Sequence, residues 1–179
     1  AQVPNGVTVG DAVRIGRSAH LKPLQGFTTE DRDEIRTSLV RARMDGFEDR
    51  QLNTLSGGEM QRVQVAVGLA QGAPVLVADE PTAQLDLGAT AGVSKLLRGL
   101  VADGLGVVLI VHDLALAAAV ADRVVVMSDG RTIATGAPLE VLTSQLIADV
   151  WGVEAELVRH QGRSGLHVEW LEGDPTGRS

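Results

Sequence analysis

Two stretches decide the fold of this chain: LSGGEMQR at residues 55–62 and VLVADEPTAQLD at residues 75–86. The first opens a helical run with two glycines behind a serine, where free backbone N–H groups and the positive end of the helix dipole attract an anion. The second is an apolar strand ending in Asp79 and Glu80, whose carboxylates suit Mg²⁺ and an attacking water at the carboxyl edge of an α/β sheet. An anion site followed by a metal and base site points to phosphoryl transfer from a nucleotide.

A second apolar strand adds a histidine to this arrangement. Residues 107–111 are continuously apolar, and His112 follows them directly. Because the carboxyl ends of parallel strands lie at one rim of a sheet, we expect His112 beside Asp79 and Glu80. The apolar character of these strands predicts a parallel sheet that is covered on both faces.

These motifs resemble those of the ATP-binding subunits of ABC transporters. Residues 55–58 resemble the family's signature motif, residues 76–80 its Walker B strand and residues 83–86 its D-loop. Gln2 resembles the Q-loop glutamine, and His112 resembles the switch histidine. The resemblance follows the family order through most of the chain. It implies an α/β fold: part of a P-loop NTPase core of ABC ATPase type, with a helical subdomain and a small C-terminal β extension.

The resemblance also implies a role for each matching residue. Glu80 would orient or deprotonate the hydrolytic water and His112 would hydrogen-bond the γ-phosphate, which makes them the candidate catalytic residues. Asp79 and Gln2 would hold Mg²⁺ through water. The candidate nucleotide-binding residues are Gln2, Ser56, Gly57, Gly58, Glu59 and Asp86. ATP and Mg²⁺ are therefore the expected cofactors.

One motif of the family does not occur in the sequence. A P-loop needs the pattern Gly-x-x-x-x-Gly-Lys-Ser/Thr directly after a strand. There are two lysines: Lys22 precedes Pro23, and Lys95 lies inside a helical run. No tyrosine is present to stack on adenine, and the chain begins with alanine, at the position of the family's Q-loop. We therefore expect a fragment that lacks roughly the first third of an ABC ATPase and is inactive alone.

The composition limits the remaining function classes. At 179 residues the chain can form one or two compact lobes. A net charge of −7 argues against a nucleic-acid binder that relies on general phosphate attraction. Cysteine is absent, which excludes disulfides and thiolate metal sites. The longest apolar runs, such as residues 115–121, are far shorter than the ~20 residues that span a bilayer, so association with a membrane would require a partner.

The order of the motifs predicts three segments. Residues 1–54 would carry the Q-loop and the helical subdomain. Residues 55–150 would form the core, with the signature helix, the Walker B strand, the D-loop and the switch histidine. Residues 151–179 would form a C-terminal β extension and a tail, whose last residues, 173–179, we expect to be disordered. Turn residues predict one β-hairpin around Asp129-Gly130 and a second within residues 153–171.

Capping patterns predict where the first two helices begin. Thr8 with Asp11, and Thr28 with Asp31, have the spacing of a capping box. We expect the second helix to end at Gly46 and to bury one apolar stripe. That stripe consists of Ile35, Leu39, Val40 and Met44.

The resemblance implies that the parent protein hydrolyses ATP to energise an importer. Glu59 stands where the family most often has glutamine, and such a glutamate recurs in importers of iron-siderophores, haem and cobalamin. The implied partners are a transmembrane permease subunit, a second ATP-binding subunit and, indirectly, a substrate-binding protein. The implied location is the cytoplasmic side of the cell membrane, as a peripheral subunit.

Two alternatives stay open. A chain without a P-loop could serve as a non-catalytic module that binds or regulates a partner. It could also belong to a soluble ABC ATPase of DNA repair or translation. The acidic balance disfavours this second alternative, as does the standard length of the segment between Gln2 and Ser56. An upstream P-loop in the coding sequence would separate the first alternative from an ATPase.

Overall fold

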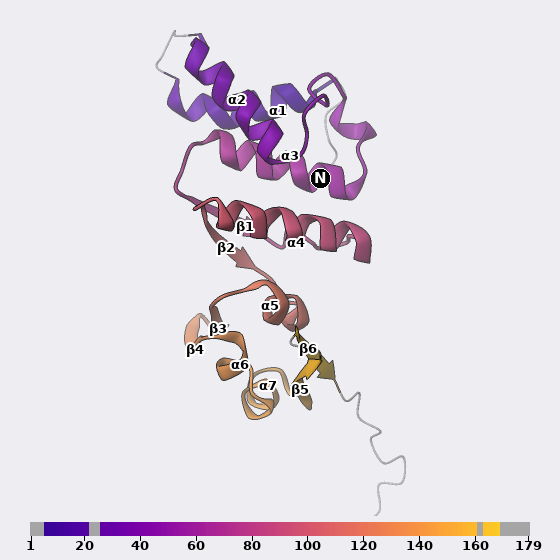
Figure 1. The fold of residues 1–179 in the computed structure, drawn as a ribbon. Helices are drawn as coiled ribbons and strands as arrows, with labels where there is room; N and C mark the ends of the chain where they lie inside the picture. The colour runs from indigo at the N-terminus through magenta and orange to yellow at the C-terminus, as the bar shows by residue number, and fades with distance from the viewer. Residues whose placement is uncertain (1–5, 22–25, 161–162, 169–179) are drawn as a thin grey trace, which may run out of the picture. The chain divides into compact units, whose positions relative to one another are not determined.

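The computed structural model describes residues 6–21, 26–160 and 163–168. The chain divides into two compact units, Ala1–Ile110 and Val111–Ser179, whose elements are labelled in Figure 1. This boundary falls inside the segment 55–150, and the division into three segments stays a prediction. Among the described helices, none combines the length and the apolarity needed to cross a lipid bilayer.

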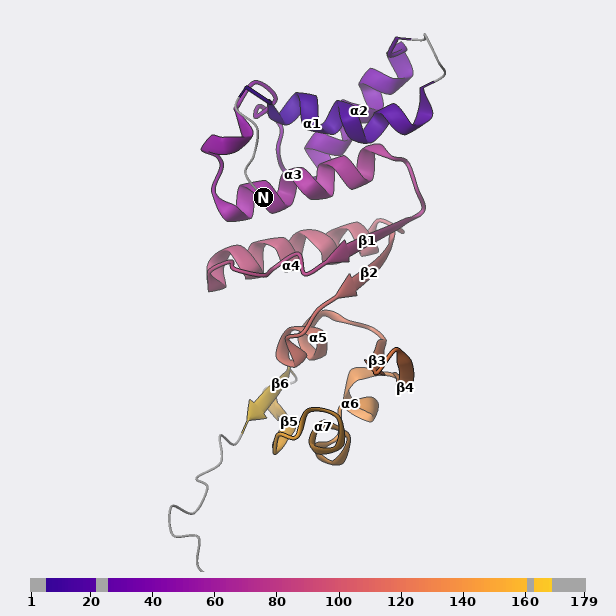
Figure 2. The same ribbon diagram turned by 180° about the vertical axis from the view of Figure 1, so that it is seen from behind.

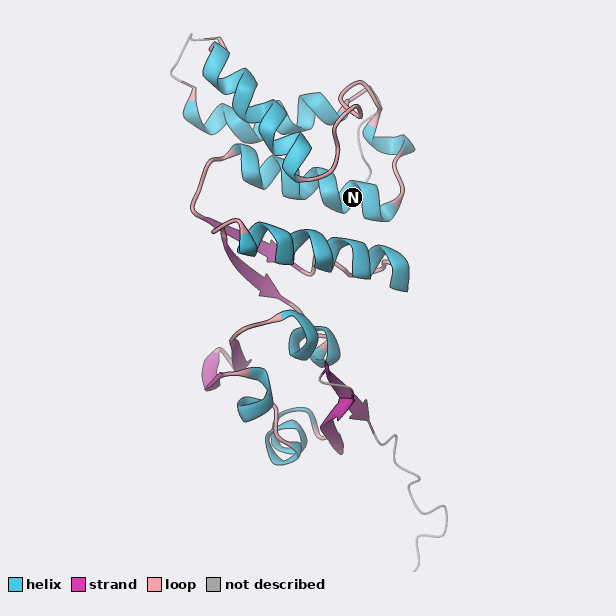
Figure 3. Ribbon diagram, viewed as in Figure 1, coloured by secondary structure: helices cyan, strands magenta, loops and turns pink. Residues whose placement is uncertain are grey.

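The described part of the first unit combines four α-helices with a two-stranded parallel sheet. The helices are α1 (Val9–Arg17), α2 (Thr29–Arg41), α3 (Gly57–Ala70) and α4 (Leu87–Ala102). The strands are β1 (Val75–Asp79) and β2 (Gly106–Ile110), and single 3-10 turns form at Ser18–His20 and Leu52–Thr54. Figure 3 distinguishes these elements by colour.

Both predicted capping boxes are confirmed. The Thr8 hydroxyl accepts from the Asp11 backbone N–H at 3.1 Å, and an Asp11 oxygen accepts from the Thr8 backbone N–H at 3.1 Å. Thr28 and Asp31 form the same pair of bonds at 3.2 and 3.0 Å. Each box satisfies N–H groups that a helix N-terminus would otherwise leave unpaired, so the sequence locates the starts of α1 and α2 correctly.

The predicted end and buried stripe of α2 need correction. The helix ends at Arg41, because Arg43 adopts the left-handed conformation (φ +59°) and the Met44 N–H donates back to the Leu39 carbonyl at 2.8 Å. Gly46 lies in the turn beyond, with φ +79°. Val40 is 51% exposed, because it lies one residue past Leu39 and therefore on another side of the helix.

One apolar core joins the helices of the first unit. Its largest fully buried side chains, from the helices and the turn after α2, are Val9, Val13, Leu39, Met44, Val63 and Val93. The backbones of α1 and α3 approach closely, since a Cβ added to Gly16 would lie 2.4 Å from the Val67 carbonyl oxygen. The helical segment and the strand that carries the acidic residues therefore belong to one packed body.

The sheet is parallel, as predicted, but only one of its faces is covered. Residues pair in register from Val75 with Gly106 to Asp79 with Ile110. The face carrying Leu76 packs on α3 and α4 in the core, and Figure 2 shows α4 alongside both strands. The opposite face is exposed, with Val77 at 63%. The prediction of two covered faces is therefore wrong: alternation along the strands gives each a second apolar face that no described element covers.

Within its described residues, the second unit contains three short helices and two antiparallel hairpins. Its elements are α5 (Leu114–Val120), β3 (Val124–Ser128), β4 (Arg131–Gly136), α6 (Pro138–Val141), α7 (Ser144–Trp151), β5 (Ala155–His160) and β6 (Arg163–Val168). Both predicted hairpins are confirmed, β3 with β4 and β5 with β6. Asp129 and Gly130 both have positive φ, +49° and +72°, which a tight hairpin turn requires. Residues 173–179, predicted to be disordered, lie outside the described residues.

Candidate functional site

The N-terminus of α3 carries the residues that were predicted to form an anion site. Ser56 is the N-cap residue, and its hydroxyl accepts from the Glu59 backbone N–H at 3.3 Å. Gly57 and Gly58 form the first turn behind it. The first N–H groups of a helix have no partner within the helix, so this turn has donors to offer a ligand.

Glu59 holds this turn in place. One of its oxygens accepts from the Ser56 backbone N–H at 2.8 Å, and the other accepts from Arg50 Nη1 at 3.2 Å. Arg50 also donates to the Thr54 carbonyl at 3.2 Å, and its guanidinium lies 4.9 Å from the centre of the Phe47 ring. The hydrogen bonds from Ser56, followed by the charge of Arg50, lower the pKa of Glu59. Glu59 is therefore ionised near neutral pH and braces the loop before the signature turn.

A cleft of about 350 Å³ lies between this turn and the D-loop. The residues that line it come from the starts of α3 and α4 and from the loop before α4. They are Ser56, Gly57, Gly58, Glu59, Arg62, Gln84, Leu85, Asp86 and Ala89. Asp86 is the N-cap of α4, and its Oδ1 accepts from the Ala89 N–H at 2.7 Å. Two helix N-termini thus line one cleft, which favours an anionic ligand.

The two glycines also have a packing role. A Cβ on Gly57 would lie 3.0 Å from Cδ2 of Leu85, and a Cβ on Gly58 would lie 3.1 Å from the Ala89 Cβ. The signature turn therefore packs against the D-loop of the same chain at distances that leave little room for larger residues. This contact adds to the expected role of glycine, which is to let a phosphate approach the backbone.

Arg62 contributes the cation of the cleft. Within the described residues, its Nε is buried and has no hydrogen-bond partner. Its Nη2 would lie 3.3 Å from a Cβ on Gly92, so the guanidinium passes close to the backbone of α4. A buried donor without an acceptor is costly, so Arg62 brings an unsatisfied group to the edge of the cleft.

Asp79 ends strand β1 at its carboxyl edge, and Glu80 follows it directly. Asp79 pairs with Ile110, and the Glu80 N–H donates to the Ile110 carbonyl at 2.9 Å. Both acidic residues are exposed. Glu80 has φ +44°, a left-handed conformation that costs an L-residue about 1–2 kcal/mol. Such strain persists where the surrounding structure imposes it, often at functional sites. The left-handed conformation of Glu80 changes the direction of the chain immediately after the strand.

The acidic pair fits a magnesium ion in its donor chemistry. Mg²⁺ prefers oxygen ligands and is usually held by one or two carboxylates together with substrate phosphates and waters. Asp79 offers such an oxygen at the exposed end of β1. Among the residues that the structure describes, no cluster of three or more His, Asp or Glu side chains is placed to hold a metal ion.

The remaining predicted residues lie elsewhere in the chain. His112 follows β2, as expected, and is exposed, but it belongs to the second unit. The next residue, Asp113, caps α5 by accepting from the Leu116 N–H at 3.0 Å. The proximity of His112 to Asp79 and Glu80 stays a prediction. Gln2 lies outside the described residues.

Comparison with known proteins identifies the family. The sequence model of the ABC transporter family matches residues 2–83. The hemin import ATP-binding protein of Streptomyces coelicolor is 41% identical over 162 residues, which cover 89% of this chain and 56% of that protein. This chain belongs to the ABC transporter family. It spans a little over half the length of that relative.

Solved structures agree with the fold of an ABC cassette. A metal-chelate type ABC transporter in an inward-facing conformation has a TM-score of 0.84 at 23% identity, covering 94% of this chain and 68% of that chain. The dimeric structure of the bacterial ABC transporter cassette MJ0796 has a TM-score of 0.61 at 27% identity, covering 76% of this chain and 59% of that chain. The predicted α/β fold of ABC type is confirmed.

The packing of the signature turn on the D-loop in this ABC chain was not predicted from the sequence. The motifs indicated Ser56, Gly57 and Asp86 as separate ligand-binding residues. Their convergence on one cleft depends on Leu85 and Ala89, which carry no chemical signal in the sequence.

Proposed function

We propose that this chain is the greater part of the ATP-binding and ATP-hydrolysing subunit of an ABC importer. The observation that carries the proposal is the cleft in which the N-termini of α3 and α4 meet beside Arg62. Two helix N-termini and a guanidinium suit a polyphosphate. Family membership and the similarity to a hemin import ATP-binding protein support ATP as that ligand.

In the proposed reaction, Glu80 orients or deprotonates the water that attacks the γ-phosphate. Its carboxylate lies at an exposed strand end, where water and nucleotide have access. Asp79 and Gln2 would hold Mg²⁺ through water, and the ion would neutralise charge on the phosphates. His112 would donate a hydrogen bond to the γ-phosphate. Ser56, Gly57, Gly58, Glu59 and Asp86 would complete the nucleotide site.

The phosphate site is proposed to form between two subunits. The cleft supplies N–H donors and one guanidinium, but none of its lining residues is a lysine. The Gly-x-x-x-x-Gly-Lys-Ser/Thr pattern does not occur among the 179 residues, so a P-loop would have to lie outside them. A head-to-tail pair with two-fold symmetry would set the signature of one subunit on the nucleotide of the other. On this proposal the 179-residue chain alone hydrolyses ATP negligibly.

The proposed partners follow from the relatives. The second ATP-binding subunit would complete the site, and a transmembrane permease subunit would hold the protein at the cytoplasmic side of the membrane. A substrate-binding protein would act through the permease. The hemin import relative favours iron chelates, with haem first, as the transported class.

ATP turnover with Mg²⁺ tests this function in the full-length polypeptide that contains residues 1–179. We expect turnover that Glu80→Gln reduces on the order of 10²-fold or more, because the water loses its base. Turnover that is undiminished in Glu80→Gln, or absent from the wild type, would reject the proposed function. Nucleotide-independent binding of a partner would then favour the non-catalytic module.

A further inference from the structure

The C-terminus of α3 is capped by side chains from another part of the fold. The last turn of α3 has no basic residue of its own. The Gly68 and Leu69 carbonyls accept from the backbone N–H groups of Gln71 and Gly72, at 3.2 and 2.9 Å. A helix end leaves further carbonyls without partners in the helix, and these carry the negative end of the dipole.

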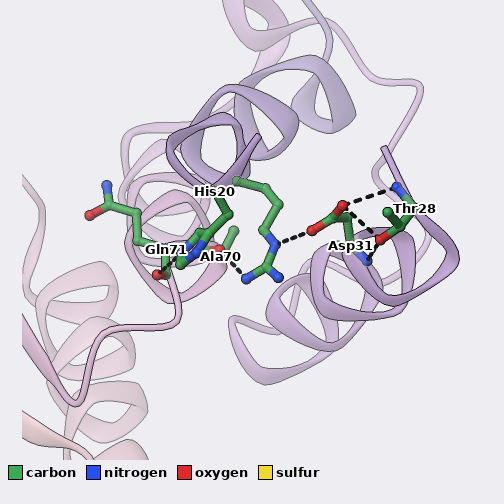
Figure 4. A network of polar contacts seen from close by, with 6 residues as sticks. His20, Thr28, Asp31, Ala70 and Gln71 are labelled. Carbon is green, nitrogen blue, oxygen red and sulfur yellow. Dashed lines mark hydrogen bonds and ion pairs between the residues drawn. The ribbon is translucent and has the colours of Figure 1, made fainter. Parts of the chain in front are cut away.

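Arg17 and His20 supply the missing donors. Arg17 Nη1 donates to the Ala70 carbonyl at 3.4 Å, and His20 Nε2 lies 2.6 Å from the Gln71 carbonyl oxygen, as Figure 4 shows for His20 and Gln71. Because a carbonyl only accepts, the His20 proton must be on Nε2. Two successive carbonyls at the end of α3 are thus satisfied from the end of α1 and the turn after it.

Asp31 fixes the Arg17 side chain. One oxygen of Asp31 accepts from Arg17 Nε at 2.8 Å, while the other accepts from the backbone N–H and the hydroxyl of Thr28, at 3.0 and 2.8 Å. The Arg17 and Asp31 side chains are only 12% and 10% exposed. The N-terminal cap of α2 and the C-terminal cap of α3 therefore share a single guanidinium.

Two glycines contribute to this arrangement, Gly16 through close packing and Gly72 through its backbone conformation. The missing Cβ of Gly16 allows α1 to approach the Val67 carbonyl of α3. Gly72 has φ +64°, and a Cβ there would lie 3.4 Å from Arg17 Nη1. The close approach and the left-handed residue place the Arg17 guanidinium at the end of α3.

We infer that Arg17 and His20 are positioning residues that hold α3 by its C-terminus and thereby fix where its N-terminus presents Ser56, Gly57 and Gly58. An α-helix of 14 residues is a stiff rod about 21 Å long, so a shift or tilt at one end moves the other. The consequence for nucleotide binding rests on the proposed function, whereas the positioning of α3 does not.

Amide hydrogen exchange on the full chain without nucleotide tests the inference. Arg17→Met and His20→Leu remove the donors, whereas His20→Gln keeps one, and Arg36→Met on the exposed side of α2 is the control. We expect exchange of the Gln71 and Gly72 amides, and of the first turns of α3, to rise about tenfold in the first two variants, because hydrogen bonds from a charged or well-aligned donor are lost. His20→Gln and Arg36→Met should exchange as the wild type does.

Two results would overturn the inference. One is wild-type exchange throughout α3 in His20→Leu, which changes an exposed side chain and so should fold even if Arg17→Met does not. The other is an equal rise in exchange in α2, α3 and α4, since that would report general loss of stability.

The ATPase assay of the full-length polypeptide gives a second measurement. His20→Leu should raise the ATP concentration for half-maximal turnover, and His20→Gln should return it to the wild-type value. Local exchange changes in a protein without ATP turnover would support the inference and reject the proposed function.

Discussion

A Cβ on Gly57 would lie 3.0 Å from Cδ2 of Leu85, so the signature turn and the D-loop of this chain are in contact. The two motifs, both expected to contribute to the nucleotide site, therefore pack directly against each other. Their contact lies within the first unit, which has a single core.

A double-mutant cycle measures this contact. Gly57→Ala forces Leu85 to move, whereas in a Leu85→Ala background the added methyl group has space. We expect the change in the free energy of unfolding caused by Gly57→Ala to be about 0.5–1 kcal/mol more stabilising in the Leu85→Ala background than in the wild type. Gly99 is the matched control, because a Cβ there meets nothing within 4 Å. Equal coupling of Leu85→Ala to Gly57→Ala and to Gly99→Ala would refute the contact.

Asp79 and Glu80 should differ in what they contribute to ATP binding. Asp79→Asn removes the proposed Mg²⁺ ligand and should weaken binding of Mg²⁺-nucleotide. Glu80→Gln should bind ATP nearly as the wild type does but fail in hydrolysis. Equilibrium binding of a fluorescent ATP analogue to the full-length polypeptide, with and without Mg²⁺, separates the two. Matching affinities in both variants would contradict the division of roles.

The backbone at Glu80 should store strain. Its φ of +44° suits glycine better than an L-residue, so Glu80→Gly should be less destabilising than Asp79→Gly by about 1 kcal/mol while abolishing turnover. Asp79→Gly, in the extended strand, should lower the free energy of unfolding by about 0.5–1 kcal/mol. Urea denaturation of both variants checks this. A loss of stability in Glu80→Gly as large as that in Asp79→Gly would show that the strain is not relieved.

Asp31 makes the stability of the helical segment sensitive to acid. The backbone N–H and hydroxyl of Thr28, followed by the Arg17 guanidinium, lower the pKa of Asp31 from 3.8 to about 2. A depressed pKa in the folded state stabilises the protein fully above about pH 4, and this contribution is lost as pH falls toward 2. The gap in urea midpoint between wild type and Asp31→Asn should therefore be constant from pH 7 to 5 and shrink below pH 4. The exposed Asp33, changed to Asn, serves as the control; a gap that widens in acid would contradict the assignment.

The sequence predicted those features that local chemistry determines. The caps at Thr8 and Thr28 follow from side chains that reach N–H groups three residues away. The parallel pairing of β1 with β2 follows from two apolar runs that are joined by a helix.

Features that depend on distant packing were not predictable. Arg43 rather than Gly46 adopts the left-handed conformation that ends α2, because Met44 is drawn into the core. The exposure of Val77 depends on which elements cover the sheet, and hydrophobicity alone does not reveal this. The packing contact between Gly57 and Leu85 likewise depends on how α3 and α4 are arranged.

The central claim is that the nucleotide site forms between two subunits. Gly57→Asp places a negative charge and a clashing side chain in the signature turn, and Glu80→Gln removes the base. Each full-length variant alone should be nearly inactive, while Gly99→Asp should remain active because a side chain there meets open space.

The most direct measurement is ATP turnover after mixing Gly57→Asp with Glu80→Gln in equal amounts. If each site takes its signature from one subunit and Glu80 from the other, a mixed dimer places both defects in one site and leaves its second site intact. Random mixing should then restore about a quarter of the wild-type turnover. If each site lies within one chain, every site in the mixture keeps a defect. Turnover no greater than that of the separate variants, with mixed dimers verified by mass spectrometry, would contradict the account.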